Sequence, residues 1–144
     1  VLLAIILILL IVSLVKNLSD RSMRRISGVK PEVHETENPD EYDTSDLEKY
    51  LNEAMQGSDY RLAIRVRFLM IIKKLQDGEY ILWQREKTNT DYLLELPENE
   101  WKQLFRSVVN IFERVWYANY RIDKDTYILL ATRFDEFHKL IGKC

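Results

Sequence analysis

The first fifteen residues, VLLAIILILLIVSLV, constrain this chain most, because Ser13 is their only polar side chain. As an α-helix with a rise of about 1.5 Å per residue they would span roughly 22 Å, compared with about 30 Å for a hydrocarbon core. The run begins with neither Met nor a basic segment. We therefore expect a transmembrane helix at residues 1–15 that is truncated at its N-terminus. The alternatives are a signal-peptide core and a buried helix, but KNLSDRSMRR follows without a small-residue cleavage site.

Charge is strongly segregated along the chain, although the net charge is only -2. Residues 1–30 carry five Lys and Arg and one Asp, whereas residues 31–43 carry six Asp and Glu and no Lys or Arg. Basic residues beside a span favour the cytoplasmic side. We therefore expect a single span in the inner membrane, with the C-terminal domain in the cytoplasm.

The segment between the span and the domain lacks apolar periodicity and contains Gly28, Pro31 and Pro39. Such a composition is typical of a flexible tether. We expect residues 16–43 to form a basic flank and an acidic linker, and residues 44–144 to form the domain. In residues 44–144 the 16 basic and 16 acidic side chains balance. A balanced domain has no overall attraction for nucleic acid, so we expect no nucleic-acid partner.

Apolar residues recur at spacings of three and four from Leu47 onwards, which predicts α-helices. Ser45 and Glu48 predict a capping box for the first helix, and Gly57 predicts its end. Ser58 is the expected cap of a second helix that runs to Gln76. Residues 68–72 are apolar all round, so this helix should be central in the core.

An irregular excursion should follow, because Asp77-Gly78 is a turn signal and residues 80–83 favour an extended segment. It is either one short strand or an ordered loop. Thr88 or Asn89 then suits the N-cap of a short helix that Pro97 ends. A long helix within residues 98–120 and a final helix capped by Asp123 complete the pattern. The sequence predicts a compact all-α domain of about five helices with one short extended excursion.

Three motifs resemble a known family. They are YRLAIR at residues 60–65, KTN at residues 87–89 followed by Tyr92 and Leu93, and Phe112-Glu113 followed by Trp116-Tyr117. Over residues 44–141 the chain resembles the bacterial C-terminal domain of unknown function number 4129. After the last motif the family commonly has Gly, where this chain has Ala118-Asn119.

The resemblance implies a helical module that follows a transmembrane helix, often at the C-terminus of transglutaminase-like membrane proteins. The transglutaminase part is absent from this sequence, and the family provides no catalytic residues to carry over. Its relatives are often encoded beside MoxR-type AAA+ ATPases and von Willebrand A-domain proteins. The resemblance therefore implies such a protein as a partner.

The candidate interaction or structural-lock residues lie mostly in these motifs. They are Arg61, Arg65, Trp83, Lys87, Thr88, Asn89, Tyr92, Glu113, Trp116 and Tyr117. For residues 87–89 we favour a helix cap and loop lock over a binding site. For Glu113 we favour pairing with an arginine such as Arg61 or Arg65 over a buried acid with a raised pKa. The aromatic residues are expected in the core, with their polar tips bonded.

Signals for catalysis are absent from the sequence. It has two His and one Cys, and no Ser lies beside a His in a motif. These residues also provide no spacing for a metal site, so we expect no cofactor and no metal. The favoured function is a membrane-tethered cytoplasmic protein-interaction module without catalytic activity. The alternatives are an enzyme with an unrecognised carboxylate site and a nucleic-acid-binding helical domain.

Overall fold

The computed structural model describes residues 38–118 and 120–142. The helices are η1 (Pro39–Glu41, a 3-10 helix), α2 (Thr44–Gln56), α3 (Tyr60–Asp77), α4 (Asn89–Glu95), α5 (Glu100–Trp116) and α6 (Lys124–Ile141). Within these described ranges there are five α-helices and no strand, which confirms the predicted all-α fold. The excursion after α3 is thus an ordered loop. The predicted transmembrane helix at residues 1–15 lies outside the described residues, and none of the helices described is long and apolar enough to cross a membrane.

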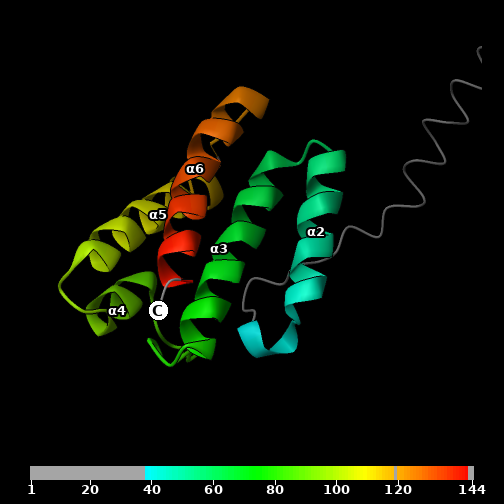
Figure 1. Cartoon of the computed structure of the whole chain (residues 1–144). Helices are drawn as coiled ribbons and strands as arrows, with labels where there is room; N and C mark the ends of the chain where they lie inside the picture. Colours follow the sequence, from blue (N-terminus) through cyan, green and yellow to red (C-terminus); the bar gives the residue numbers. More distant parts are fainter. Residues whose placement is uncertain (1–37, 119, 143–144) are drawn as a thin grey trace, which may run out of the picture. The chain divides into compact units, whose positions relative to one another are not determined.

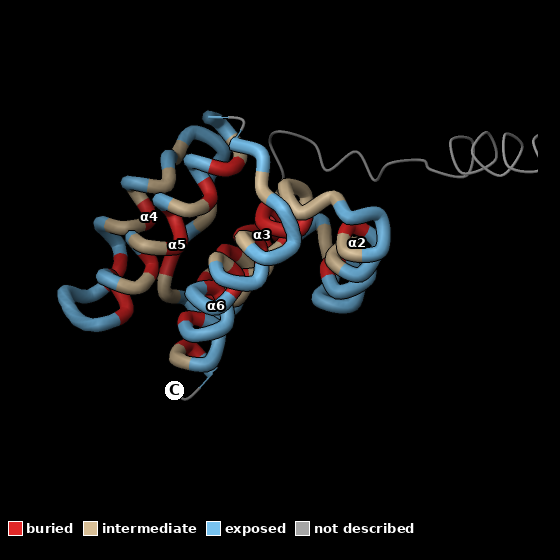
Figure 2. Tube along the Cα trace, turned by 90° about the horizontal axis from the view of Figure 1, so that it is seen from above, coloured by how far each residue is buried: buried red, intermediate tan, exposed pale blue. Residues whose placement is uncertain are grey.

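Helix α3 is the central element, as its apolar character predicts. It contacts α2 on one side and α5 and α6 on the other (Figure 1). Figure 2 shows buried positions along α3 between these neighbours. Val66 and Leu69 pack with Leu47 of α2, whereas Phe68 and Ile71 belong to the larger core with α5 and α6. Both faces of α3 are therefore buried, which its sequence between residues 68 and 72 requires.

Aromatic rings join α3 to α5 and α5 to α6. Phe68 of α3 lies parallel to Phe112 of α5, with ring centroids 4.1 Å apart and an interplanar angle of 5°. Phe105 of α5 packs on Phe137 of α6 at 5.5 Å. Aromatic pairs of this kind add about 0.5–1.5 kcal/mol beyond area burial, so the first pair stabilises the packing of α5 on α3 and the second that of α6 on α5.

The turn between α2 and α3 differs from the prediction at Ser58. This residue adopts a left-handed conformation with φ 55°, and the N–H of Asp59 donates to the Ala54 carbonyl at 2.8 Å. The pattern is a Schellman motif that closes α2. Since Ser58 is used to end α2, the cap of α3 is Asp59, whose carboxylate accepts the Leu62 N–H at 3.1 Å.

The packed region also extends further towards the N-terminus than the expected start at Thr44. Asp43 is the N-cap of α2, and its N–H donates to the Asp46 carboxylate at 3.4 Å. The predicted capping box of Ser45 and Glu48 is therefore wrong by two residues. Before it, η1 packs on α3, where the Gln76 amide donates to Asp40 at 2.6 Å.

A second Schellman motif ends α3 and directs the chain into the loop. Glu79 is left-handed with φ 58°, and the Tyr80 N–H donates to the Leu75 carbonyl at 2.9 Å. The Tyr80 ring then folds over Gly78, where a Cβ would lie 2.6 Å from the ring. The same ring packs edge-on against Trp101 at 4.7 Å. Gly78 is needed here for this close approach.

Candidate functional site

The loop after α3 is bonded to α4 through one buried phenol. Tyr92 is 5% exposed. Its hydroxyl donates to the Gln84 carbonyl at 3.1 Å and accepts from the Gln84 N–H at 3.4 Å. Burial raises the pKa of Tyr92 above its usual value, against the opposite influence of the Gln84 bond. The phenol therefore stays neutral and can serve as both donor and acceptor.

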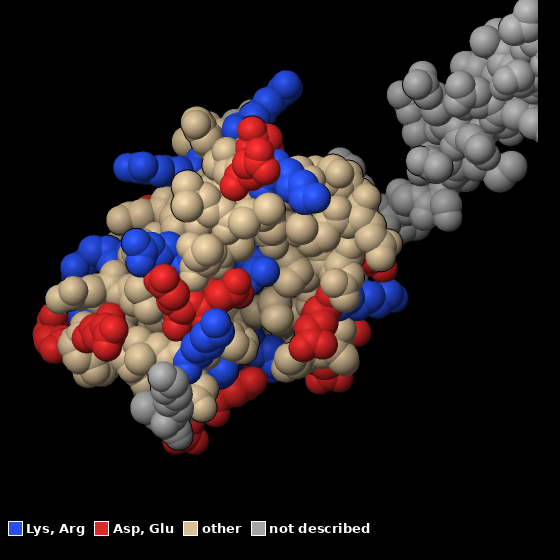
Figure 3. All heavy atoms as spheres, turned by 45° about the horizontal axis from the view of Figure 1, so that its top comes forward, with Lys and Arg blue, Asp and Glu red and all other residues tan. Residues whose placement is uncertain are grey.

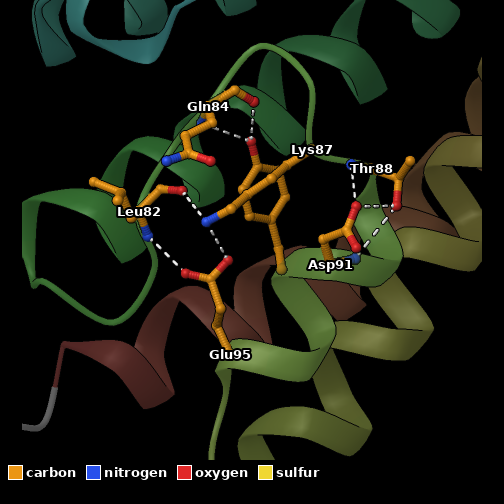
Figure 4. Close-up of polar contacts among 7 residues, drawn as sticks. Leu82, Gln84, Lys87, Thr88, Asp91 and Glu95 are labelled. Carbon is orange, nitrogen blue, oxygen red and sulfur yellow. Dashed lines mark hydrogen bonds and ion pairs between the residues drawn. The ribbon is translucent and has the colours of Figure 1, made fainter.

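A second set of bonds holds the same loop two residues earlier. The Lys87 ammonium donates to the Leu82 carbonyl at 2.8 Å and to Glu95 at 2.9 Å (Figure 4). The other Glu95 oxygen accepts the Leu82 N–H at 2.9 Å. Lys87 and Glu95 are only 22% and 29% exposed at their side chains. The backbone N–H of Leu82 is thus bonded by Glu95 of α4, and its carbonyl by Lys87, the residue before the N-cap of α4.

The start of α4 is a reciprocal cap. The Thr88 hydroxyl accepts the Asp91 N–H at 3.3 Å, and Asp91 accepts the Thr88 N–H at 2.7 Å. The Thr88 N–H and the Thr88 hydroxyl both donate to the Asp91 carboxylate, and these two bonds lower the pKa of Asp91 below its usual value. Of the two predicted caps, Thr88 is confirmed. Asn89 has another role, because its amide donates to Glu113 at 3.2 Å and connects α4 to α5.

Two arginines of α3 meet the last turn of α5. Arg61 donates to the carbonyls of Val115 and Trp116 at 3.3 and 2.6 Å. Its guanidinium carbon lies 4.4 Å from the centre of the Trp116 ring, and that of Arg65 lies 4.3 Å from it. A cation at a helix C-terminus matches the helix dipole, and a guanidinium over Trp adds a cation–π contact.

Between these two assemblies lies a pocket of about 250 Å³. Its apolar floor comes from α3 and α5, and its rim comes from the loop, α4 and the end of α5. Seven of the ten candidate residues line it: Arg65, Trp83, Lys87, Asn89, Tyr92, Trp116 and Tyr117. Thr88, Arg61 and Glu113 are not among its lining residues, but each is bonded to an element that forms the wall. The folding of the domain therefore gathers the three sequence motifs around one pocket.

The lining of this pocket is basic and aromatic. Arg65, Arg85 and Lys87 contribute cations, and no Asp or Glu lines the pocket in the part of the chain that the structure describes. Arg65 is 7% exposed, although it is charged. Such a lining favours an anionic group over a cationic one.

The structure excludes one alternative for Glu113 and one expectation for Tyr117, and it gives Glu113 a bond with Asn89 where we had favoured an arginine. Glu113 is exposed, so it is not a buried acid, since it lies on the outer side of α5. Tyr117 is 72% exposed rather than part of the core, because α5 ends at Trp116 and Tyr117 is its C-cap. Tyr117 contacts Phe112 edge-on at 5.7 Å and stands at the rim of the pocket. Trp83 and Trp116 are half-buried and pack against the core.

Sequence reasoning missed Glu95, Gln84 and Arg85 as members of the site. Lys87 and Glu95 are eight residues apart, a spacing with no helical meaning because Lys87 precedes the helix. Gln84 takes part through its backbone, which leaves no signal in the sequence. A Thr-x-x-Asp pattern at residues 88–91 did mark the cap, as a relative of the capping box.

In the described ranges, no group of three or more His, Cys, Asp and Glu side chains is placed to hold a metal ion. No family model matches the chain, and neither a curated protein nor a solved structure was found that is significantly similar to it. The resemblance to the domain of unknown function number 4129 stays a prediction from its motifs.

Proposed function

We propose that this chain is a membrane-tethered, cytoplasmic helical module that binds another protein and has no catalytic activity of its own. The observation that carries the proposal is the pocket between Arg65, Arg85 and Trp116. Arg, Trp and Tyr are the side chains that most often dominate the energy of protein interfaces. Here they meet at one place, with Tyr117 exposed beside them.

The size of the pocket supports a protein partner. Sites for drug-sized ligands and cofactors typically enclose about 300–1,000 Å³. A pocket of about 250 Å³ is smaller, and suits one or two side chains of a partner that also covers the rim. The loop that forms this rim is held by Tyr92, Lys87 and Glu95, so little ordering is needed when the partner binds.

The enzyme alternative lacks a suitable carboxylate at this pocket. Asp91 accepts bonds in the cap of α4, and Glu113 is exposed and bonded to Asn89. Glu95 accepts bonds in the loop lock, by which we mean the bonds that Tyr92, Lys87 and Glu95 make to the loop after α3. The nucleic-acid alternative would be favoured by a continuous basic surface. On the face that Figure 3 shows, acidic and basic side chains are intermixed.

The membrane tether rests on the sequence of residues 1–30 and is tested by topology. A reporter enzyme fused after Cys144 should be active in the cytoplasm. Replacing Arg21, Arg24 and Arg25 by Glu should weaken that orientation, because basic flanks are retained on the cytoplasmic side. Activity of the wild-type fusion in the periplasm would contradict the assignment.

The partner is tested by affinity capture of the full chain from membranes of the cells that express it. A MoxR-type AAA+ ATPase or a von Willebrand A-domain protein is the expected class of captured protein. Capture should be lost in Arg85→Glu, because this exposed residue lines the pocket. It should persist in Arg106→Glu, a matched charge reversal at an exposed residue that does not line it. A captured protein that both variants retain would contradict binding through this pocket.

A further inference from the structure

The chemistry of the pocket narrows the class of partner. We infer that it receives an acidic side chain, next to an aromatic or aliphatic one, from a segment of the partner protein. This inference rests on the proposed function and specifies what binds at the same site. Three cations line the pocket, and among the described residues no Asp or Glu does. Its apolar floor is formed by four residues: Phe68, Leu69, Ile72 and Phe112.

Arg65 is fixed at the wall of the pocket by its contact with Trp116. Its guanidinium face lies over the Trp116 ring, 4.3 Å from the ring centre. Stacking uses the face of a guanidinium and directs its five N–H donors outward in the plane. Arg65 thereby adds a fixed positive charge to the wall, which favours an anionic group of the partner.

Arg85 provides a second charge at the mouth of the pocket. It is exposed, but the preceding residue, Gln84, is bonded through both backbone groups to the Tyr92 hydroxyl. The lock thus fixes the backbone from which Arg85 extends. Lys87 is already paired with Glu95, so Arg85 is the cation whose replacement changes the pocket most without breaking the lock.

The aromatic side chains account for the apolar neighbour of the acidic group. Trp83 and Trp116 are half-buried at the wall, and Tyr117 is 72% exposed at the rim. A partner that covers them removes their apolar surface from water, which favours binding. The same cover strengthens the attraction between the arginines and a carboxylate, since it lowers the local dielectric. An acidic group without an apolar neighbour would leave these rings uncovered.

The probe for this inference is a phage-displayed library of short random peptides, selected on the full chain in detergent micelles. The selected peptides should combine Asp or Glu with an aromatic or aliphatic residue. Their affinity should fall about tenfold or more in Arg85→Glu. It should stay unchanged in Arg106→Glu. Arg85→Lys keeps the charge and should retain most of the binding, which separates recognition from folding.

The outcomes separate the two proposals. Peptides that depend on Arg85 but lack acidic residues would overturn this inference and leave the interaction module standing. If every selected peptide binds equally to Arg85→Glu, or none is enriched, the pocket is not the binding site and both proposals fail. Displacement of the selected peptides by a free peptide of residues 31–37, PEVHETE, as effective as the best of them, would assign the site to this chain and overturn the assignment to a partner.

Discussion

The Tyr92 hydroxyl bonds both backbone groups of Gln84, at 3.1 Å to its carbonyl and 3.4 Å to its N–H. One side chain of α4 therefore makes the two backbone hydrogen bonds that a neighbouring strand would make in a sheet. Lys87 and Glu95 do the same for Leu82. These residues form a loop lock, and the lock positions Arg85 and Trp83 at the pocket. In this arrangement the KTN motif caps α4 and holds the loop, and its Lys87 and Asn89 also line the pocket. We propose that the partner is contacted by Arg65, Arg85 and Trp116.

Tyr92→Phe tests the phenol bond. The change removes the hydroxyl and keeps the ring in the core, so the free energy of unfolding should fall by about 0.5–1.5 kcal/mol. Urea denaturation followed by circular dichroism measures it. Tyr120→Phe is the matched control, because Tyr120 is 61% exposed, and it should change stability by less than about 0.5 kcal/mol. Equal stability of the two variants would mean that the phenol bond contributes nothing.

Mutations at Thr88 and Asn89 should differ in their effect on stability, because only Thr88 caps α4. Thr88→Ala removes the acceptor for the Asp91 N–H and should cost about 1 kcal/mol of stability. Thr88→Ser retains the hydroxyl and should recover most of it. Asn89→Ala should cost less than about 0.5 kcal/mol, since the Asn89–Glu113 bond is exposed. A larger loss from Asn89→Ala than from Thr88→Ala in chemical denaturation would contradict the assignment of the cap.

Asp91 should give the stability of the domain a dependence on pH in the acid range. Its folded-state pKa lies below the usual value of 3.8, because the Thr88 N–H and hydroxyl stabilise the carboxylate. The contribution is therefore fully present above pH 3.8 and is lost as pH falls through the folded-state pKa. Wild type should be more stable than Asp91→Asn at neutral pH, and the difference should shrink in acid. Glu48→Gln, at an exposed residue of α2, controls for net charge. A difference that stays constant down to acid pH would refute the ionised cap.

The two glycines that end α2 and α3 should respond differently to alanine. At Gly78 a Cβ would lie 2.6 Å from the Tyr80 ring and displace it from Trp101. Gly78→Ala should therefore lower stability by about 1–3 kcal/mol. At Gly57 the nearest atom to a Cβ is 3.4 Å away and φ is -77°, so Gly57→Ala should be neutral or stabilising by up to about 1 kcal/mol. Thermal unfolding of both variants measures these changes. If Gly78→Ala were as stable as wild type, the Tyr80 ring would not be fixed in its place over Gly78.

The helices were predictable from the sequence because their signals are local. Apolar spacing along α3 predicted a central helix, and Thr88 and Asp123 predicted caps that the structure has. The ends were less predictable where two local preferences compete. Ser58 was the predicted cap of α3, but it takes the left-handed conformation that closes α2, and Asp59 caps α3 instead.

The pocket was only partly predictable, because it depends on contacts between distant residues. The motifs singled out most of its lining, including Trp116, and they also included Arg61, which bonds the end of α5. The bonding partners of these residues were not predicted. Arg61 was expected to pair with a carboxylate, but it donates to the backbone carbonyls of Val115 and Trp116. Tyr117 is exposed because α5 ends at Trp116, whereas the sequence predicted a long helix within residues 98–120.

The central claim is that the lock supports the pocket and the pocket binds. The most direct measurement compares chemical denaturation with capture of the selected peptides for Tyr92→Phe, Thr88→Ala and Arg85→Glu of the same full chain. Tyr92→Phe and Thr88→Ala should lose binding only as far as they lose folding. Arg85→Glu should keep its stability within about 0.5 kcal/mol and lose binding. Undiminished stability with lost binding in Thr88→Ala would make the KTN motif itself the binding surface, and would contradict this account.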